Sequence, residues 1–414
     1  MRRPEHTPLI ATKLKCPQYH DTMVERTLAA EGPRLEGCKA ILVLAPAGYG
    51  KTVFLSQLAQ KAPIPTAWYS LEPHDNEPLT FIRHLAGAFQ EYVTIDEIQL
   101  QRLISRTERD RLCRSAVSFC IRALESTTGI VIALDNWEVI SDPCIYQLVG
   151  ELVPLLPPQV QIAIGGRLSL DVVGTLGLER LHLAGEVQVV GRKDLEFSEA
   201  ELDRFYTLRC PSLEREQFDT VARMSHGWPI MVNFLTQQGR GLGEGQDKIS
   251  PALAAYIDKE VLGIVPAELQ DFLIKASVFS SFTAAECDEL LGISASRDHI
   301  RRLESHQLLL AQKGGEYRVV PIIRSYLLDK LGKERASLFG QAASIAIARG
   351  RLHEAISCFL EGGQRGSIAD LVVKLAEEAL LHGRWQEVED WFDTAIALED
   401  VKGNPRLALL QALV

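Results

Sequence analysis

The chain has 414 residues, 46% of them hydrophobic and 24% charged, which is the composition of a globular protein with about two to four domains. The net charge of −10 argues against a surface that coats nucleic acid, because neutralising phosphates requires clustered Lys and Arg. No apolar run approaches the ~18–20 residues of a membrane span, and the N-terminus lacks the long apolar core of a secretory signal. The 8 cysteines are scattered without a CxxC pair, so we expect neither a zinc site nor a disulfide framework, and we expect a cytoplasmic protein.

Residues 1–38 are predicted to form an N-terminal segment. Asp21 is a candidate N-cap, and Met23–Leu28 is predicted to be a short helix. Segments that precede a phosphate-binding strand often lie near the base of a nucleotide, which makes Val24 a candidate contact. A plain surface helix explains the pattern equally well.

A strand, a glycine-containing turn and a helix follow one another over residues 39–60. The apolar run Ile41–Leu44 predicts a buried parallel strand, and helical spacing begins at Lys51. Gly48 and Gly50 permit positive φ and close backbone approach, so that consecutive N–H groups can point at phosphate oxygens. The turn also opens onto a helix N-terminus, which favours anions.

These features predict a P-loop for ATP or ADP. Lys51 would reach the β- and γ-phosphates, and the Thr52 hydroxyl would ligate Mg²⁺. The nucleotide contacts that we expect along the loop are Ala47, Gly48, Tyr49, Gly50, Lys51, Thr52 and Val53. The strict motif begins with Gly, but this chain has Ala45 there, and a coincidental GKT between a buried strand and a buried helix is the alternative.

A second strand, Thr66–Leu71, precedes a helical pattern that runs from Leu79 to about Glu125 with one break. The next strand ends in Asp135. A carboxylate at the C-terminal end of such a strand holds Mg²⁺ in P-loop proteins, usually through water. The following residue, Asn136, can orient a water but cannot accept its proton, so we predict slow hydrolysis unless another base serves.

A further strand over residues 160–167 ends at Arg167, whose guanidinium suits a γ-phosphate or a leaving group. A surface arginine after a strand is the alternative. Val187–Val190 predicts one more strand. We therefore expect an α/β P-loop NTPase domain at 39–194, a parallel sheet with helices on both faces. Its catalytic candidates are Lys51, Asp135, Asn136 and Arg167, and its metal ligands are Thr52 and Asp135.

Strands nearly vanish after residue 194. Ser198 and Glu201 make a capping box at the start of a helix. Gly227-Trp228-Pro229 separates two further helices, and these residue types alone indicate only a helix end at Gly followed by a helix start at Pro. Residues 239–250 predict an exposed linker that ends a short helical domain at 195–250.

Helices followed by a hairpin around Gly314-Gly315 predict a winged-helix domain at 251–332. The same fold binds DNA in many proteins, but the helix before the hairpin is only modestly basic, which favours a packing role. The pattern predicts helices from Ala336 to the end, in an arm at 333–414, and GR-x-x-E recurs after 33 positions at Gly350 and Gly383, close to the tetratricopeptide period. We expect a helical arm that starts a TPR-like array. The apolar, uncapped helix Pro405–Val414 indicates that the array stops or has been cut there.

With these motifs the chain resembles the N-terminal portion of the MalT-type LuxR-family ATP-dependent regulators, which are STAND-class P-loop NTPases. The resemblance spans nearly the whole sequence, and PAGYGKT with GWP are its most specific motifs. The residues that carry it are Lys13-Leu14 with Pro17, APAGYGKT at 45–52 with FLSQLAQ, Ala67–Leu71, Asp135-Asn136, LEFSEAEL at 195–202, Gly227-Trp228-Pro229, Tyr256–Leu262, and Asn404-Pro405 with LALLQALV.

The resemblance implies a switch that buries ADP between its NTPase and winged-helix domains and exchanges it for ATP when an inducer binds, with self-association. The sensor for the inducer and the helix-turn-helix for DNA are expected outside this sequence. It also implies that Gly227, Trp228 and Pro229 help to close the nucleotide pocket. Two residues depart from the family: Asn136 replaces a second Asp, and Val320 replaces a His that is thought to touch the ADP β-phosphate.

The leading hypothesis is therefore an ATP/ADP-gated core of a transcriptional activator, with weak ATPase activity at most. A conventional P-loop ATPase or small-molecule kinase is the second, although only His74 and Asp75 offer acceptor chemistry. A scaffold with a vestigial nucleotide site is the third, for which Ala45, Asn136 and Val320 are the arguments.

Overall fold

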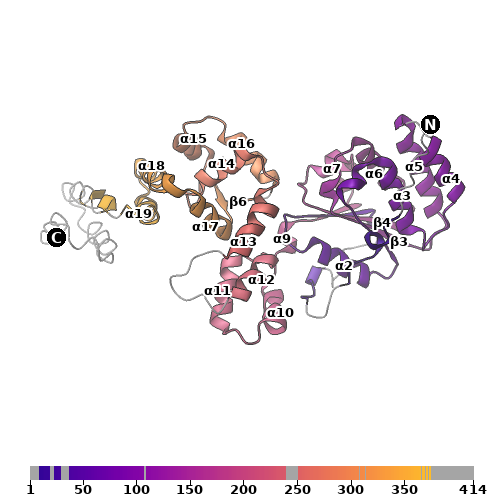
Figure 1. Cartoon of the computed structure of the whole chain (residues 1–414), viewed down its shortest axis with the longest axis horizontal. Coiled ribbons are helices and arrows are strands. Elements are labelled where there is room, and N and C mark those ends of the chain that lie inside the picture. The colour runs from indigo at the N-terminus through magenta and orange to yellow at the C-terminus, as the bar shows by residue number, and fades with distance from the viewer. Residues whose placement is uncertain are drawn as a thin grey trace. The chain divides into compact units, whose positions relative to one another are not determined.

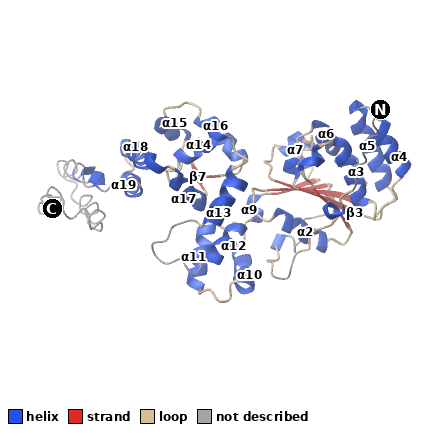
Figure 2. Cartoon of the chain, viewed as in Figure 1, coloured by secondary structure: helices blue, strands red, loops and turns tan. Residues whose placement is uncertain are grey.

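The computed structural model describes residues 9–18, 23–28, 37–106, 109–238, 250–306, 308–312, 314–364, 366–368, 370–371 and 373. The chain divides into two compact units. The first comprises Met1–Lys248 with Ser305–Gln307, and the second comprises Ile249–Glu304 with Leu308–Val414. Figure 2 shows that strands are concentrated in the first unit and that helices dominate the second. The finer domain boundaries given above remain predictions.

The first unit is built on a five-stranded sheet in the order β2-β3-β4-β1-β5, all parallel. The strands are β1 (Ala40–Leu44), β2 (Thr66–Ser70), β3 (Ile130–Asp135), β4 (Val160–Gly166) and β5 (Val187–Val190). All residues of β1, β3 and β4 are buried, as expected for runs of Val, Ile, Leu and Ala covered on both faces. All five strands were predicted from the sequence. Because β1 lies between β4 and β5, it is an inner strand, and its C-terminal end lies at the sheet edge where ligands of such folds bind.

Helices cover both faces of this sheet (Figure 1). Helix α2 packs on one face, whereas α3, α5 and α6 lie on the other. The helices and single turns of this layer are η1 (Ala11–Leu14), α2 (Lys51–Lys61), η2 (Pro73–Asn76), α3 (Pro78–Phe89), α4 (Glu97–Arg106), α5 (Arg109–Leu124), η3 (Trp137–Val139), α6 (Pro143–Leu155), α7 (Val172–Thr175), α8 (Glu179–Leu183) and α9 (Arg192–Leu195). The arrangement confirms the predicted α/β P-loop NTPase fold class.

Three helices complete the described part of the first unit: α10 (Glu199–Arg209), α11 (Arg215–Ser225) and α12 (Pro229–Gln238). Helix α10 begins with the capping box that the sequence predicted, in which Glu201 N–H donates to Ser198 Oγ and Ser198 N–H donates to Glu201 Oε2. His226 and Gly227 have positive φ and end α11, and Pro229 starts α12. The predicted linker at 239–249 lies outside the described residues.

The second unit contains the helices and hairpin of a winged-helix domain, followed by two arm helices. Its elements are α13 (Pro251–Tyr256), η4 (Ile257–Leu262), α14 (Ala267–Ala276), α15 (Ala284–Leu291), α16 (Ser296–Ser305), β6 (Leu309–Ala311), β7 (Tyr317–Val319), α17 (Pro321–Lys330), η5 (Gly332–Glu334), α18 (Arg335–Ala348) and α19 (Leu352–Glu361). The hairpin turn places Gly314 and Gly315 at φ of 84° and 78°, which only glycine adopts without strain. The second GR-x-x-E unit, at Gly383, and the last helix lie outside the described residues.

Salt bridges tie the arm to the rest of the second unit. Arg351 at the start of α19 pairs with Glu286 in α15, a carboxylate with 3% of its surface exposed. Arg324 in α17 pairs with Glu361 at 2.9 Å and donates to the carbonyls of Ser277 and Phe279. The same two ends of α19 are therefore fixed by charge as well as by packing.

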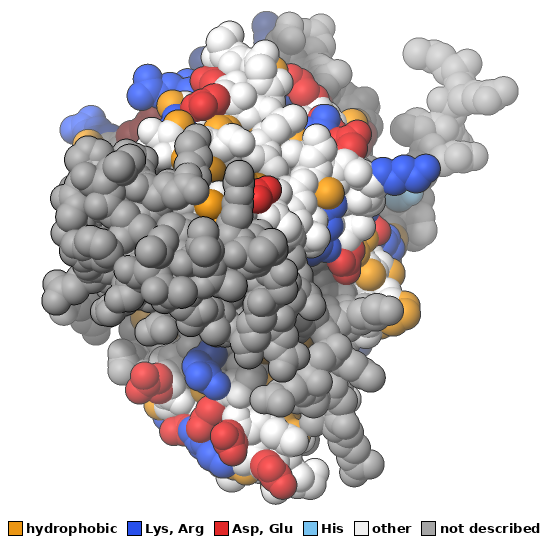
Figure 3. All heavy atoms as spheres, turned by 90° about the vertical axis from the view of Figure 1, so that its left-hand side faces the viewer, with side chains coloured by type: hydrophobic (Ala, Val, Ile, Leu, Met, Phe, Trp, Pro, Cys, Tyr) orange, Lys and Arg blue, Asp and Glu red, His pale blue; other side chains and the backbone are white. Residues whose placement is uncertain are grey.

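Surface charges of both signs are interspersed over the described part of the face shown in Figure 3. None of the described helices combines the length and apolar character that crossing a membrane requires.

One expectation from the sequence is wrong in part. Thr27 and Leu28 of the helix predicted at Met23–Leu28 are helical, but Val24, Glu25 and Arg26 are not, because side chains from other elements take up their backbone hydrogen bonds. A disulfide framework was not expected from the sequence, and the structure pairs two of the cysteines, Cys113 in α5 and Cys144 in α6, with Cα atoms 6.2 Å apart. The packing of α5 on α6 brings these cysteines together, and no local spacing in the sequence announces it.

Candidate functional site

The P-loop follows β1 and ends at the first turn of α2. Gly48 and Gly50 have φ of 77° and 81°, the left-handed region that the sequence predicted for them. Lys51 is 8% exposed, and its Nζ donates to the Pro46 carbonyl at 2.8 Å. Burial lowers the pKa of Lys51 to about 8, since a desolvated ammonium without an anionic ligand is unfavourable. The loop thus presents a buried lysine side chain that a bound phosphate would contact.

Thr52 and Asp135 meet at the sheet edge. The Thr52 hydroxyl donates to Asp135 Oδ2 at 2.7 Å, although 83 residues separate them in the sequence. Asp135 is 2% exposed, and burial raises its pKa. Its Oδ1 has no hydrogen-bond partner among the described residues. A hydroxyl beside a buried carboxylate with a spare oxygen fits Mg²⁺, which takes one or two protein oxygens and completes its octahedron with water and phosphate.

Gly165 leaves the space for this arrangement. A Cβ at this position would lie 2.6 Å from Leu55 Cδ1 and 3.2 Å from Asp135 Oδ1. The glycine in β4 therefore allows α2 and the Asp135 carboxylate to approach the sheet closely. No group of three or more His, Cys, Asp or Glu side chains in the described residues is arranged to hold a metal, so a cation here would depend on phosphate and water.

Asn136 and Arg167 have structural roles that the sequence analysis did not predict. Asn136 has φ of 64° and turns the chain from β3 into η3, a conformation that Asn tolerates better than most residues. Its place in the structure is thus explained by backbone geometry. Arg167 follows β4 and is held by Glu138, whose Oε1 lies 3.1 Å from Arg167 Nε and whose Oε2 accepts from Arg167 N–H at 3.1 Å.

The segment Gly227-Trp228-Pro229 contacts the P-loop directly. Trp228 Nε1–H donates to the Ala47 carbonyl at 3.1 Å, and Ile230 N–H donates to the Gly48 carbonyl at 3.1 Å. The rings of Tyr49 and Trp228 stack with centroids 5.3 Å apart. Burial accordingly raises the pKa of Tyr49. The helical segment of the first unit therefore contacts three consecutive P-loop residues, two through their backbone carbonyls and Tyr49 through its ring.

A cavity of about 330 Å³ opens beside these contacts. It is lined by Met23, Val24, Arg26, Gly48, Gly50, Val53, Phe197, Phe205, Arg209, Pro229, Ile230 and Asn233. The lining is mostly apolar, with two arginines and one amide, and it begins at the phosphate-binding turn. Such a cavity fits a flat, partly apolar group attached to phosphates.

The N-terminal segment reaches this cavity because two distant elements anchor it. Gln57 in α2 accepts from Arg26 N–H at 2.8 Å and donates to the Val24 carbonyl at 3.0 Å. The Arg26 guanidinium pairs with Glu201 at 3.2 Å and lies over the ring of Phe197. Burial lowers the pKa of Arg26, and the Glu201 carboxylate opposes that effect. Val24 is placed without the predicted helix.

The structure thus gathers most of the predicted site residues, from Ala47 to Val53 together with Val24, Asp135 and Gly227 to Pro229. It adds residues that the sequence analysis missed, namely Arg26, Gln57, Glu138, Arg209 and Asn233. Only Glu138 had a usable signal, as a carboxylate three residues after Asp135. Val320 precedes α17 in the second unit and is 4% exposed, so its side chain is buried.

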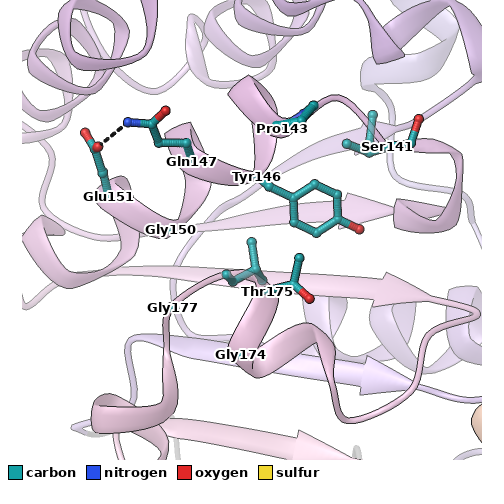
Figure 4. A pocket seen from close by; sticks show the side chains of 11 residues that line it. Ser141, Pro143, Tyr146, Gln147, Gly150, Glu151, Gly174, Thr175 and Gly177 are labelled. Carbon is teal, nitrogen blue, oxygen red and sulfur yellow. Dashed lines mark hydrogen bonds between the residues drawn. The ribbon is translucent and has the colours of Figure 1, made fainter.

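A larger hollow of about 760 Å³ lies elsewhere in the first unit, between α6 and the segment that follows β4 (Figure 4). The ring of Tyr146 lies beside Thr175 there, and Gln147 is hydrogen-bonded to Glu151 at 2.8 Å. None of the P-loop residues lines it. It carries no positively charged side chain, so it does not fit a phosphate.

A parallel sheet with a P-loop at the end of an inner strand, followed along the chain by a winged-helix domain, defines the P-loop NTPase class. Comparison with known proteins narrows this class. Residues 258–339 match the family description "MalT winged helix domain". The HTH-type transcriptional regulator MalT of Klebsiella pneumoniae (strain 342) is 23% identical over 421 residues, and that of Serratia proteamaculans (strain 568) is 24% identical over 422. The chain is a distant relative of the MalT regulators.

These alignments cover 98% of this chain but 46% of each relative, so the chain spans about half the length of the relatives it matches. Among solved structures, a STAND protein with a tetratricopeptide repeat sensor from Pyrococcus horikoshii is 15% identical, with a TM-score of 0.37, over 94% of this chain and 56% of that one. The Cdc6p protein of Pyrobaculum aerophilum is 14% identical, with a TM-score of 0.33, over 71% and 88%.

Proposed function

We propose that this chain is the nucleotide-binding core of a signal-responsive transcriptional regulator, in which ATP and ADP select between two domain arrangements. The P-loop would bind the phosphates, with Lys51 on the β- and γ-phosphates. Thr52 and Asp135 would hold Mg²⁺, which neutralises phosphate charge when bound. The base would enter the cavity beside Val24 and Pro229. Distant similarity to MalT regulators supports the regulatory part of the proposal.

The observation that carries the proposal is that Trp228 and Ile230 are hydrogen-bonded to the P-loop. Both make backbone-directed hydrogen bonds to carbonyls of the phosphate-binding turn, at Ala47 and Gly48. A turn that only catalysed phosphate transfer would need no such attachment to a helical segment 181 residues away in the sequence. A nucleotide that adjusts the turn therefore changes the position of α12, which is how a bound ligand biases a two-state packing.

Slow hydrolysis follows from the same site. Asn136 forms the backbone turn and cannot accept a proton. No carboxylate therefore stands directly after Asp135 to activate a water molecule quickly. We assign slow hydrolysis, nucleotide-dependent self-association and a cytoplasmic location to the proposal. We place recognition of a small-molecule or protein inducer, and DNA binding through a helix-turn-helix, in the part of the relatives that this chain does not cover.

The test is the nucleotide content of the purified protein. The chain is purified without added nucleotide, denatured, and its supernatant is analysed by anion-exchange chromatography. We expect close to one ADP or ATP per chain. A Lys51→Ala variant is expected to lose it while unfolding within about 2 °C of the wild type that has been freed of nucleotide. An empty wild-type site that also fails to take up Mg-ATP or Mg-ADP would refute the proposal and favour a vestigial site.

A further inference from the structure

We propose that Glu138 is an internal ligand of Arg167 that a γ-phosphate must displace, so that this carboxylate sets how strongly the pocket distinguishes ATP from ADP. The inference rests on the proposed function and deepens it. It assigns a role to a residue that none of the sequence motifs includes.

The contact between the two side chains is specific. Glu138 uses both carboxylate oxygens on one residue, at 3.1 Å from the Arg167 side chain and at 3.1 Å from its backbone N–H. The side chains are 22% and 27% exposed. The pair is therefore buried enough for the charges to interact strongly, and open enough for an incoming anion to compete.

The pair belongs to the phosphate site. Arg167 directly follows Gly166, whose carbonyl accepts from the N–H of Ala45 at the start of the P-loop at 3.3 Å. The charges of both members also reach Lys51, since Glu138 raises the pKa of Lys51 and Arg167 lowers it, although burial is the larger effect. The Glu138 charge also raises the pKa of Asp135, again after burial. Two cations and two carboxylates thus share the edge of the sheet. Their charges balance before any phosphate arrives, and Arg167 already has an anionic partner.

The backbone under Glu138 is rigid, so the exchange is confined to side chains. Trp137 is completely buried and packs edge-on against Phe81 and Tyr146, with centroids at 6.1 Å and 5.5 Å. Asn136 fixes the turn before it. Glu138 is presented from this anchored turn, and its side chain can rotate away without unfolding η3. The Arg167 guanidinium can exchange a carboxylate for a phosphate, because arginine binds both kinds of oxygen anion.

The consequence is a difference between the two nucleotides. ADP lacks the group that reaches Arg167, so it binds with the Glu138–Arg167 pair intact. ATP gains Arg167 only by giving up the two bonds to Glu138. Glu138 therefore lowers the affinity for ATP selectively and favours the ADP-bound state.

The experiment measures dissociation constants for Mg-ADP and for a non-hydrolysable Mg-ATP analogue by isothermal titration calorimetry, on the full chain freed of nucleotide. Glu138→Gln removes the charge with little change in shape. We expect it to tighten binding of the ATP analogue about five- to tenfold and to change ADP affinity less than twofold. Glu179→Gln in α8, exposed and equal in charge change, is the matched control and is expected to leave both constants unchanged.

Two further variants make the result decisive. In an Arg167→Ala background the Glu138→Gln substitution is expected to change the ATP-to-ADP ratio less than twofold, because the shared partner is gone. Glu138→Asp, whose carboxylate is one methylene shorter, is expected to act in the same direction as Glu138→Gln with a smaller effect, and it replaces Glu138→Gln if that variant does not fold.

The outcomes separate the two proposals. A wild-type chain that binds neither nucleotide refutes the proposed function itself. A wild-type chain that binds both, with an ATP-to-ADP ratio that Glu138→Gln leaves unchanged, refutes only the role of Glu138. The same holds if Glu138→Gln weakens ATP binding, because that would make Glu138 part of the ATP site.

Discussion

Replacing Gly227 with alanine tests whether the backbone before Trp228 must approach its neighbours closely. Gly227 has φ of 73°, where a non-glycine residue costs about 1–2 kcal/mol. A Cβ there would lie 2.9 Å from the Phe197 carbonyl oxygen and 3.2 Å from its nitrogen. The Phe197 N–H donates to the Gly227 carbonyl at 2.7 Å, so the added methyl group must push apart a hydrogen-bonded pair of segments.

Gly185 supplies the control, because it has φ of 79° and nothing within 4 Å of its Cβ position. Gly185→Ala pays the conformational strain alone, about 1–2 kcal/mol, whereas Gly227→Ala adds the displacement of Phe197. In a unit of this size each kcal/mol lowers the unfolding midpoint by about 2–4 °C. Thermal unfolding should therefore place Gly227→Ala at least about 2 °C below Gly185→Ala.

The two variants should also differ in nucleotide release. Gly227→Ala shifts Trp228 from the Ala47 carbonyl and is expected to accelerate release of a fluorescent ADP analogue about tenfold, the effect of roughly 1.4 kcal/mol. Gly185→Ala is expected to leave the release rate unchanged. Equal midpoints and equal release rates for the two variants would show that the close approach at Gly227 is irrelevant, and the reasoning would fail.

Two buried ion pairs give further predictions. Lys13→Met is expected to destabilise the first unit by about 3–5 kcal/mol in denaturant unfolding, because it leaves the fully buried Asp75 without its cation. Burial lowers the pKa of Lys13, but hydrogen bonds to Glu72 and Asp75 raise it more, so that its pKa lies above the ordinary value of 10.5. The difference in the free energy of unfolding between wild type and variant should therefore be constant from pH 7 to about pH 9 and should shrink only above pH 10.5. Arg351→Gln, which leaves the buried Glu286 carboxylate poorly paired, should cost the second unit about 1–3 kcal/mol, and an equal loss in an exposed-arginine control would contradict the argument.

The sheet could be predicted because its signals are local. Apolar runs gave the strands, and the P-loop glycines and Asp135 follow from spacing and from the rule that ligands bind at strand C-termini. Thr52 lies at the start of α2 and Asp135 ends β3, two elements that pack together in this fold, so recognising the fold was enough to predict that they meet. Their 2.7 Å contact needed no further information.

The rest of the site depends on contacts that no local pattern encodes. Glu138 after β3 pairs with Arg167 after β4, and Arg26 pairs with Glu201, which is 175 positions further along the sequence. The non-helical backbone at Val24 is imposed by Gln57, and without that side chain the local letters favour a helix. Cys113 and Cys144 meet because two helices pack, which is decided by their apolar faces and not by cysteine spacing.

The position of β1 has a consequence for how the protein is made. β1 carries the P-loop, yet both of its partners, β4 and β5, are synthesised after it, and β5 ends only at Val190. At ribosomal rates of about 5–20 residues per second, the P-loop strand emerges on the order of ten seconds before its sheet can close around it. The N-terminal segment at Val24 and Arg26 is anchored later still, because Arg26 pairs with Glu201, which is synthesised after β5. Nascent chains of this protein therefore expose their most apolar strand early and can acquire a nucleotide site only late in synthesis.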